Sequence, residues 1–194
     1  MSIFDKVAKA VMPPESAEDR AEARRKAEAM AAECPFLADV LDHHRQIEQA
    51  FIAGMSANDA ASRTAAVKRL AAILGAHANA EEAVLYPAMA DNHEKGHAGM
   101  AYQEQAMTKI QLAKLELIEP MSQEWLDKLE HIQGAVAHHM YEEEGTWFPE
   151  LIEQIPPAQH EHIITRFREE FERYSGGNSS GMSASEPRDA RELA

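Results

Sequence analysis

The sequence predicts an all-α protein, an up-down-up-down four-helix bundle with additional N- and C-terminal helices. Glycine and proline are sparse within long stretches rich in Ala, Leu, Glu, Lys and Gln, residues that favour helices. The sequence has no alternating β-branched run of the kind that forms strands. Short connections separate the long helical stretches, which favours antiparallel packing of successive helices.

The first elements follow in order along the chain. An N-terminal helical extension is expected in residues 1–35, where a charged, alanine-rich segment at 16–33 begins with Ser16 as N-cap. The bundle is expected in residues 36–155, with helices at about 36–54, 58–90, 98–118 and 122–146. Polar sequences mark the breaks between these helices: SAND at 56–59, DNHEKGHAG at 91–99 and EPMS at 119–122.

The last third of the chain ends with a turn, a helix and a tail. A short turn is predicted at 147–155, and a C-terminal helix is predicted in 156–174, after Pro156 and Pro157. The segment 175–194 is rich in Gly and Ser and almost free of large apolar residues. We therefore expect a disordered tail.

The charge and the apolar content restrict the partners and the compartment. The chain has 33 acidic and 19 basic residues, a net charge of −14, which argues against nucleic acid and anionic membranes as partners. No stretch resembles a signal peptide or a membrane-spanning helix. The single cysteine, Cys34, fits a reducing compartment. We expect a cytoplasmic protein; the oligomeric state is not indicated.

Polar residues interrupt the apolar stripes of three predicted helices. His44 lies on the stripe of the first helix, His77 and Glu81 on that of the second, and His139 and Glu143 on that of the fourth. A buried carboxylate without a partner is costly, and no Lys or Arg lies on these stripes. A bound cation is the simplest source of the missing positive charge.

The spacing of these residues supports a metal site. His and Glu four residues apart share one helix face, and this pair occurs twice, in HANAEEAVLYP at 77–87 and in HHMYEEEGTWFP at 138–149. Each residue also has a simpler interpretation: His44 as a hydrogen-bonded core histidine, and His77 with Glu81 as an internal pair. The repetition favours a metal. Mixed nitrogen and oxygen ligands suit iron or manganese, and zinc is possible.

Other polar and aromatic residues near the stripes have less specific roles. Glu82, Glu142 and Glu144 are expected to be solvated, and His43 lies at the flank of its stripe. Five aromatic residues are expected mainly to pack: Tyr86, Tyr102, Tyr141, Trp147 and Phe148. Of these, Tyr102 is the candidate for a phenol donor near the site.

Residues 93–97 read HEKGH and match the H-E-x-x-H zinc-protease pattern. That pattern works only on a continuous helix, whereas this segment contains Gly96 and lies in a predicted break. We expect a loop or a helix start, with at most a weak metal site at His93 and His97.

Four segments together resemble the hemerythrin-like, or HHE cation-binding, domain over about residues 36–155. They are DHHRQIEQAF at 42–51, HANAEEAVLYP at 77–87, EQAMTKIQLAKLE at 104–116 and HHMYEEEGTWFP at 138–149. The resemblance implies a four-helix bundle with a non-haem, usually di-iron centre, bridged by oxo and carboxylate groups. It places ligands at His44, His77, Glu81, His139 and Glu143, with the two glutamates as bridges.

The third helix departs from the family pattern. The family motif reads Glu-His there, and this chain has Glu104 and Gln105. Gln105 could be a weak ligand, Glu104 or a water could replace it, or one iron could keep an open position. An open position favours turnover or sensing over simple oxygen carriage.

The favoured hypothesis is a metal-binding protein that binds or senses dioxygen, nitric oxide or iron. The alternative is a di-iron enzyme that consumes peroxide or nitric oxide at the same centre. A metal-free helical interaction module and a zinc hydrolase at HEKGH are less favoured.

Overall fold

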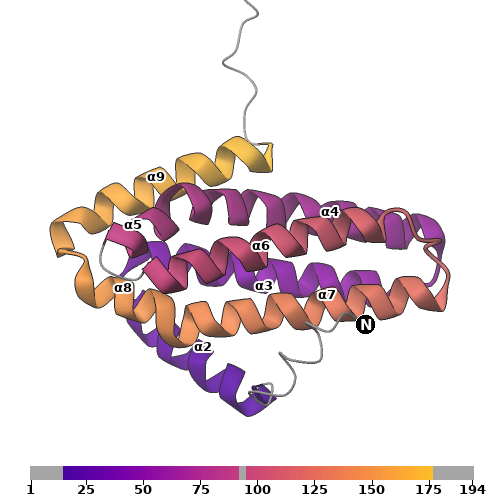
Figure 1. Cartoon of the computed structure of the whole chain (residues 1–194), viewed down its shortest axis with the longest axis horizontal. Helices are drawn as coiled ribbons and strands as arrows, with labels where there is room; N and C mark the ends of the chain where they lie inside the picture. The colour runs from indigo at the N-terminus through magenta and orange to yellow at the C-terminus, as the bar shows by residue number, and fades with distance from the viewer. Residues whose placement is uncertain (1–14, 92–94, 177–194) are drawn as a thin grey trace, which may run out of the picture.

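The computed structural model describes residues 15–91 and 95–176, and these residues form helices and turns without a strand. The prediction of an all-α protein is confirmed. The long helices lie lengthwise beside one another, each running back along the one before it (Figure 1). They are α3 (Pro35–Ser56), α4 (Ala60–Ala80), α6 (Lys95–Leu115) and α7 (Gln123–Glu142).

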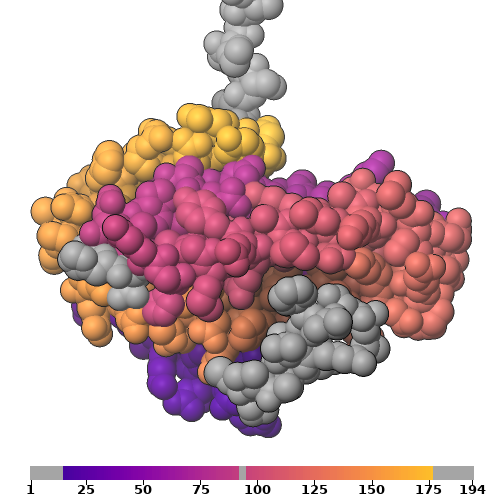
Figure 2. Space-filling view, in the orientation of Figure 1, coloured from indigo at the N-terminus to yellow at the C-terminus, as the bar shows by residue number. Residues whose placement is uncertain are grey.

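Each long helix packs against two others. Helix α3 contacts α4 and α7, and α6 contacts α7 and α4. Helix α2 (Ala17–Ala31) packs against α3 and α7, while α9 (Pro157–Ser175) packs against α4 and α3. In the space-filling view α9 and α2 lie at opposite edges of the face that α6 and α7 form (Figure 2). None of the described helices combines the length and apolar character needed to cross a membrane.

Side-chain caps fix the starts of three helices. Ser16 caps α2 in a capping box with Asp19, as the sequence predicted. Asp59 caps α4, and Ser122 caps α7 by accepting the backbone N–H of Trp125. These caps fix where the helices begin, and so the register of their polar residues.

The predicted turn at 147–155 is wrong, because the chain stays helical there. A π-helical segment, η2 (Glu143–Trp147), follows α7 and leads into α8 (Phe148–Gln154). Proline in the first turn of a helix is tolerated because the N–H that it lacks would have no partner there. Pro149 stands in the first turn of α8, so it does not end the helix.

The second helix continues in the same way. Helix α4 passes through a π-helical segment, η1 (Glu81–Leu85), into α5 (Tyr86–Asp91), close to the predicted end at residue 90. The predicted helix 98–118 begins earlier and ends earlier, as α6. Residues 177–194, which contain most of the predicted disordered tail, and His93 lie outside the described residues.

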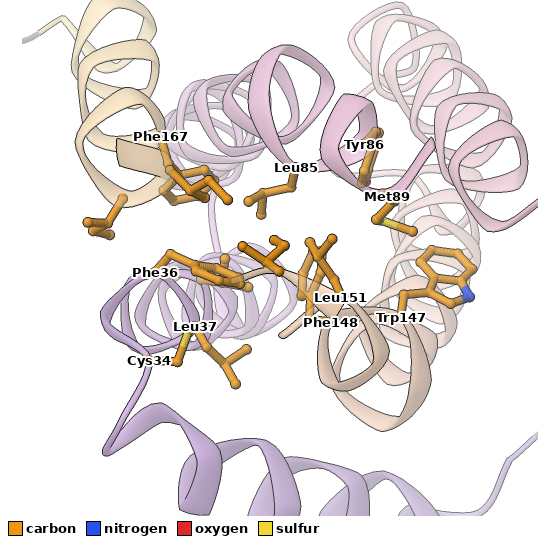
Figure 3. Packing of buried hydrophobic residues seen from close by; sticks show 14 of the residues in the cluster. Cys34, Phe36, Leu37, Leu85, Tyr86, Met89, Trp147, Phe148, Leu151 and Phe167 are labelled. Atoms are coloured by element: carbon orange, nitrogen blue, oxygen red, sulfur yellow. The ribbon is translucent and has the colours of Figure 1, made fainter. Parts of the chain in front are cut away.

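The core consists of two apolar clusters. One contains residues from α3, η1, α5, α8 and α9 (Figure 3), including Phe36, Leu37, Leu85, Met89, Phe148, Leu151 and Phe167. The other includes Ile47, Phe51, Leu70, Leu112, Leu129 and Ile132. Along α3, His44 lies between Leu41 of the first cluster and Ile47 of the second. The same order recurs along α4, along α6 and along α7 continued by η2, so a polar layer lies between two apolar ones.

Candidate metal centre

The structure brings the six candidate ligands into this polar layer, where all are buried. They are His44 of α3, His77 of α4, Glu81 of η1, Gln105 of α6, His139 of α7 and Glu143 of η2. Four long helices, or the segments that continue them, therefore contribute to one centre. Their role as ligands remains a prediction, which the geometry below supports for some of them more than for others.

Four of these residues form a compact group of potential ligands. One ligand atom each from His44, His77, Glu81 and Glu143 lies within 4.8 Å of the others. His44 Nε2 is 3.3 Å from Glu143 Oε2, and His77 Nε2 is 3.2 Å from Glu81 Oε1. Two ligands of one first-row cation lie at most about 4 Å apart, so a slight contraction is enough.

Each of these four residues has a buried ligand atom without a hydrogen-bond partner: His44 Nε2, His77 Nε2, Glu81 Oε1 and Glu143 Oε2. Buried polar atoms are nearly always paired, and each exception requires an explanation. Here the unpartnered atoms lie together and are all of types that bind cations. The residues present fit one bound cation, which would pair all four atoms at once.

Protons can balance the carboxylates when no cation is bound. Burial lowers the pKa of His44, but the close approach of Glu143, the hydrogen bond to Glu144 and the charges of both carboxylates outweigh burial and raise the pKa to about 9. Burial raises the pKa of the Glu81 carboxyl, and the charge of Glu143 raises it further. The case for a cation therefore rests on the unpartnered atoms more than on charge alone.

The other three candidate atoms converge on a tyrosine hydroxyl. The Tyr86 oxygen lies 3.2 Å from Glu81 Oε2, 3.0 Å from Glu143 Oε1 and 3.1 Å from His139 Nε2. Gln105 Nε2 donates to this oxygen at 2.6 Å and to Glu81 Oε2 at 2.7 Å. Tyr86, expected only to pack, is the centre of this network. Gln105 contributes a donor here, whereas a ligand would contribute a lone pair.

A carboxylate outside the helix stripes holds His139. Glu104 Oε2 lies 2.8 Å from His139 Nδ1, so the residue beside the substituted Gln105 orients the imidazole. Burial lowers the pKa of His139, but the charge of Glu143 and the hydrogen bond to Glu104 outweigh burial and raise it. Glu104 therefore lies next to the centre without reaching the compact group.

The prediction that Glu144 is solvated is wrong. Glu144 is buried, and its Oε1 accepts from His44 Nδ1 at 2.6 Å. Arg24 of α2 donates to the other oxygen of Glu144 at 2.7 Å. A carboxylate on Nδ1 leaves Nε2 of the same ring free to bind a cation, an arrangement common behind metal-bound histidines.

Three further residues near the predicted site have contacts unlike those of a metal ligand. His43 is buried and stacks on Phe171 of α9 at 3.7 Å, and burial lowers its pKa to about 4. The Tyr102 hydroxyl donates to the backbone carbonyl of Glu82, so it is not the phenol donor of the centre. His97, in the first turn of α6, lies 3.6 Å from Glu150.

The π-helical segments explain why the apolar stripes of regular helices did not predict the positions of Tyr86 and Glu144. Glu81 and Glu143 each begin such a segment, six residues before Pro87 and Pro149. Proline clashes with the carbonyl four residues earlier, and a wider turn relieves the clash. The Tyr86 N–H accordingly donates to the Glu81 carbonyl, five residues back. Five residues of an α-helix rotate a side chain about 140° off its face, whereas the π turn keeps Tyr86 beside Glu81.

A small cavity of about 20 Å³ adjoins the centre. Its polar lining includes His77, Gln105 and His139, and its apolar lining includes Ile47, Leu74, Val136 and Met140. One water molecule needs about 10–15 Å³ by the same kind of measure. The cavity therefore has room for one molecule of about that size.

Fold and site together define an all-helical protein with a buried His/Glu site suited to a cation. The model of the hemerythrin HHE cation binding domain family matches residues 35–151, and the chain belongs to this family. The resemblance stated from the sequence is thereby confirmed, as is membership of a family that binds cations.

A DNA nickase of Nostoc sp. (strain PCC 7120 / SAG 25.82 / UTEX 2576) is similar to this chain. The two are 31% identical over 111 residues, which make up 56% of this chain and 32% of the nickase. The similarity thus spans about a third of the length of that relative. No solved structure gives a significant match.

Proposed function

We propose that this chain is a non-haem iron protein whose centre lies among His44, His77, Glu81 and Glu143. The observation that carries the proposal is the group of four unpartnered, buried ligand atoms within 4.8 Å of one another. Two nitrogen and two oxygen ligands suit iron(II) or manganese(II), and they also accept zinc. Iron is favoured by the family resemblance, which also implies a second iron.

We also infer that α3, α4, α6 and α7 form the up-down-up-down four-helix bundle of the family. The support is the ring of contacts in which each of these helices packs against two others. In this arrangement α2 and α9 are the additional N- and C-terminal helices, packed on the outside. The bundle is what allows residues far apart in sequence to meet at one centre.

We propose that the centre binds or senses a small ligand such as dioxygen or nitric oxide. The support is the cavity of about 20 Å³ lined by His77 and His139, which is large enough for a molecule of that size. Its other walls include Leu74 and Val136, which favour an apolar molecule over a charged one.

An enzyme that consumes peroxide or nitric oxide at this centre is the second candidate. It is favoured by His139, which lines the cavity and keeps a proton because its pKa is raised. Stopped-flow mixing of the reduced, iron-loaded protein with each small molecule distinguishes the two functions. A long-lived adduct supports binding or sensing, and rapid repeated turnover supports an enzyme.

DNA cleavage is not carried over from the nickase. The similarity covers 32% of that protein, and this chain has 33 acidic against 19 basic residues. That charge repels phosphates, which DNA-binding proteins attract with Lys and Arg.

The first prediction tests the cation site with a matched pair of carboxylates. Replacing Glu81 with Gln removes an anionic ligand, and we expect the iron affinity to fall by about tenfold or more. Glu82 points away from the centre and pairs with Lys109 at 2.7 Å, so Glu82→Gln should bind iron as the wild type does. Iron content is measured by elemental analysis after reconstitution and desalting. Equal iron content in the two variants would contradict the assignment.

A further inference from the structure

We propose that this centre holds one cation instead of two, because the Tyr86 hydroxyl and the Gln105 amide occupy the position of the second. The proposal rests on the proposed function, since it specifies how many ions the same site binds. The single ion is a divalent first-row cation held by His44, His77 and one oxygen each of Glu81 and Glu143.

The carboxylates of Glu81 and Glu143 divide the centre into two positions. Glu81 Oε1 and Glu143 Oε2 have no hydrogen-bond partner. Glu81 Oε1 faces the imidazole of His77, and Glu143 Oε2 faces that of His44. The other oxygens of the two carboxylates lie with His139 Nε2 around the Tyr86 hydroxyl, and these three atoms would form a second position. A pair of bridged ions requires carboxylates of this kind, in which one oxygen faces the first ion and the other oxygen faces the second. The two positions differ in what occupies them.

The second position is occupied by an oxygen atom of the protein. The Tyr86 oxygen lies 3.0–3.2 Å from all three candidate ligand atoms of that position. A cation would have to lie about 2.1 Å from the same three atoms, and thus in the space that the hydroxyl fills. The hydroxyl has one proton to donate, and the remaining hydrogen bonds come from neighbours: Gln105 Nε2 donates to Glu81 Oε2, and His139 Nε2 lies 3.1 Å from Glu143 Oε1. Each of the three atoms therefore has a partner within the protein and does not require a cation.

The Tyr86 ring cannot easily move aside. The residue is fully buried and belongs to the apolar cluster that contains Met89 and Trp147 (Figure 3). Its ring also packs edge-on against Tyr102, with 5.1 Å between the ring centres. Close-packed interiors resist such displacements, so the hydroxyl is held in place.

Gln105 strengthens the exclusion because it presents a donor. Its Nε2 points at Glu81 Oε2 and at the Tyr86 oxygen, while its Oε1 is buried without a partner. The opposite amide orientation would place Oε1 against the Glu81 oxygen, which is unfavourable. An N–H group directed at the second position repels a cation there. Histidine, which the family pattern has at this place, can offer a lone pair.

The repeated sequence shows why the two positions differ. Each half of the repeat supplies a histidine, a glutamate and then an aromatic residue directly before proline. The aromatic residue is Tyr86 in one half and Phe148 in the other. Phe148 has no polar atom with which to fill a position. Only the half that contains tyrosine therefore replaces a cation with a hydroxyl.

The test counts the cations in the full-length protein. The purified chain is freed of metal with a chelator, titrated with ferrous ion without oxygen, desalted and measured by elemental analysis. We expect about one iron per wild-type chain and about two in the double variant Tyr86→Phe/Gln105→His, which removes the hydroxyl and supplies an imidazole. Tyr102→Phe is the matched control, because the Tyr102 hydroxyl bonds to a backbone carbonyl away from the centre, and it should keep about one.

Each outcome has a definite meaning. Two irons per wild-type chain would overturn the proposal, whichever residue held the second ion. A folded double variant that still takes up one iron would overturn the role of Tyr86 and Gln105. A wild-type chain that takes up no iron would instead refute the proposed function, and this result is distinct from either of the others. Circular dichroism establishes that each variant is folded, and the wild-type count tests the proposal by itself.

Discussion

Glu144 shows how a single residue outside the ligand group can control the centre. Its carboxylate lies between His44 Nδ1 and the guanidinium of Arg24, at 2.6 Å and 2.7 Å. Burial raises the pKa of Glu144, but its hydrogen bonds with His44 and Arg24 outweigh burial and keep the pKa low. The ionised carboxylate fixes the ring so that Nε2 faces Glu143.

We expect Glu144→Gln to weaken iron binding by about 10- to 100-fold, the usual effect of removing a carboxylate behind a metal-bound histidine. A neutral amide orients His44 less strongly and makes the ring a poorer ligand. Competition with a metal-sensitive dye measures the dissociation constant. Glu142→Gln is the control, because Glu142 is only partly buried and two residues away in sequence. A dissociation constant unchanged in Glu144→Gln would mean that His44 is oriented by other contacts.

At the residue scale, the sequence located the candidate ligands and missed their partners. His44, His77 and Glu81 stand where helical periodicity places leucines, and the structure has them in the interior. Tyr86 and Glu144 lie off those stripes and are nonetheless buried. Periodicity assumes a uniform helix, and both residues lie in or directly after a π-helical segment that breaks it.

At the scale of the helices, two prolines shape the centre. Pro87 and Pro149 lack the N–H that would continue an α-helix, and the turns before them widen into η1 and η2. The widened turns place Glu81 and Glu143 at the ends of α4 and α7, facing one another across the centre. The repeated proline is therefore part of the candidate metal motif.

We expect Pro87→Ala to weaken iron binding by about tenfold or more without lowering the free energy of unfolding. Alanine restores an N–H that can donate to the carbonyl of Ala83 and favours the regular helix, which would change how the Glu81 side chain faces the other candidate ligands. Iron affinity and urea unfolding are measured on the same sample. Pro157→Ala should leave affinity unchanged, because Pro157 stands in the first turn of α9. Wild-type affinity in Pro87→Ala would show that the proline does not maintain the π turn.

At the scale of the whole molecule, the centre connects helices that are otherwise held by two separate apolar clusters. The polar layer interrupts the core at the middle of α3 and α6 and at the ends of α4 and α7, where η1 and η2 begin. A cation bound there would join α3, α4 and the segments that follow α4 and α7. Metal binding should thus stabilise the entire domain and not only its site.

Iron at a hundredfold excess over the dissociation constant should stabilise the fold by about 2.7 kcal/mol. For a domain of this size, that corresponds to a rise in Tm of about 5–10 °C. Thermal unfolding of chelator-treated and iron-loaded protein, followed by circular dichroism without oxygen, measures the shift. The shift should be much smaller in Glu143→Gln, which lacks one anionic ligand. An identical Tm with and without iron in the wild type would be evidence against a cation inside the core.

The sequence by itself determined the helical class, the approximate helices and the residues that replace apolar side chains in the core. This information is local, because helical periodicity depends on residues three and four positions apart. The tertiary structure decided how those residues are paired: His44 meets Glu144 across 100 positions, and Tyr86 meets His139 across 53. Such pairs depend on how helices pack and where a proline widens a turn, and no short stretch of sequence specifies either. For that reason the sequence indicated a metal site, and the structure was needed to show that the Tyr86 hydroxyl lies 3.0–3.2 Å from three of the candidate ligand atoms.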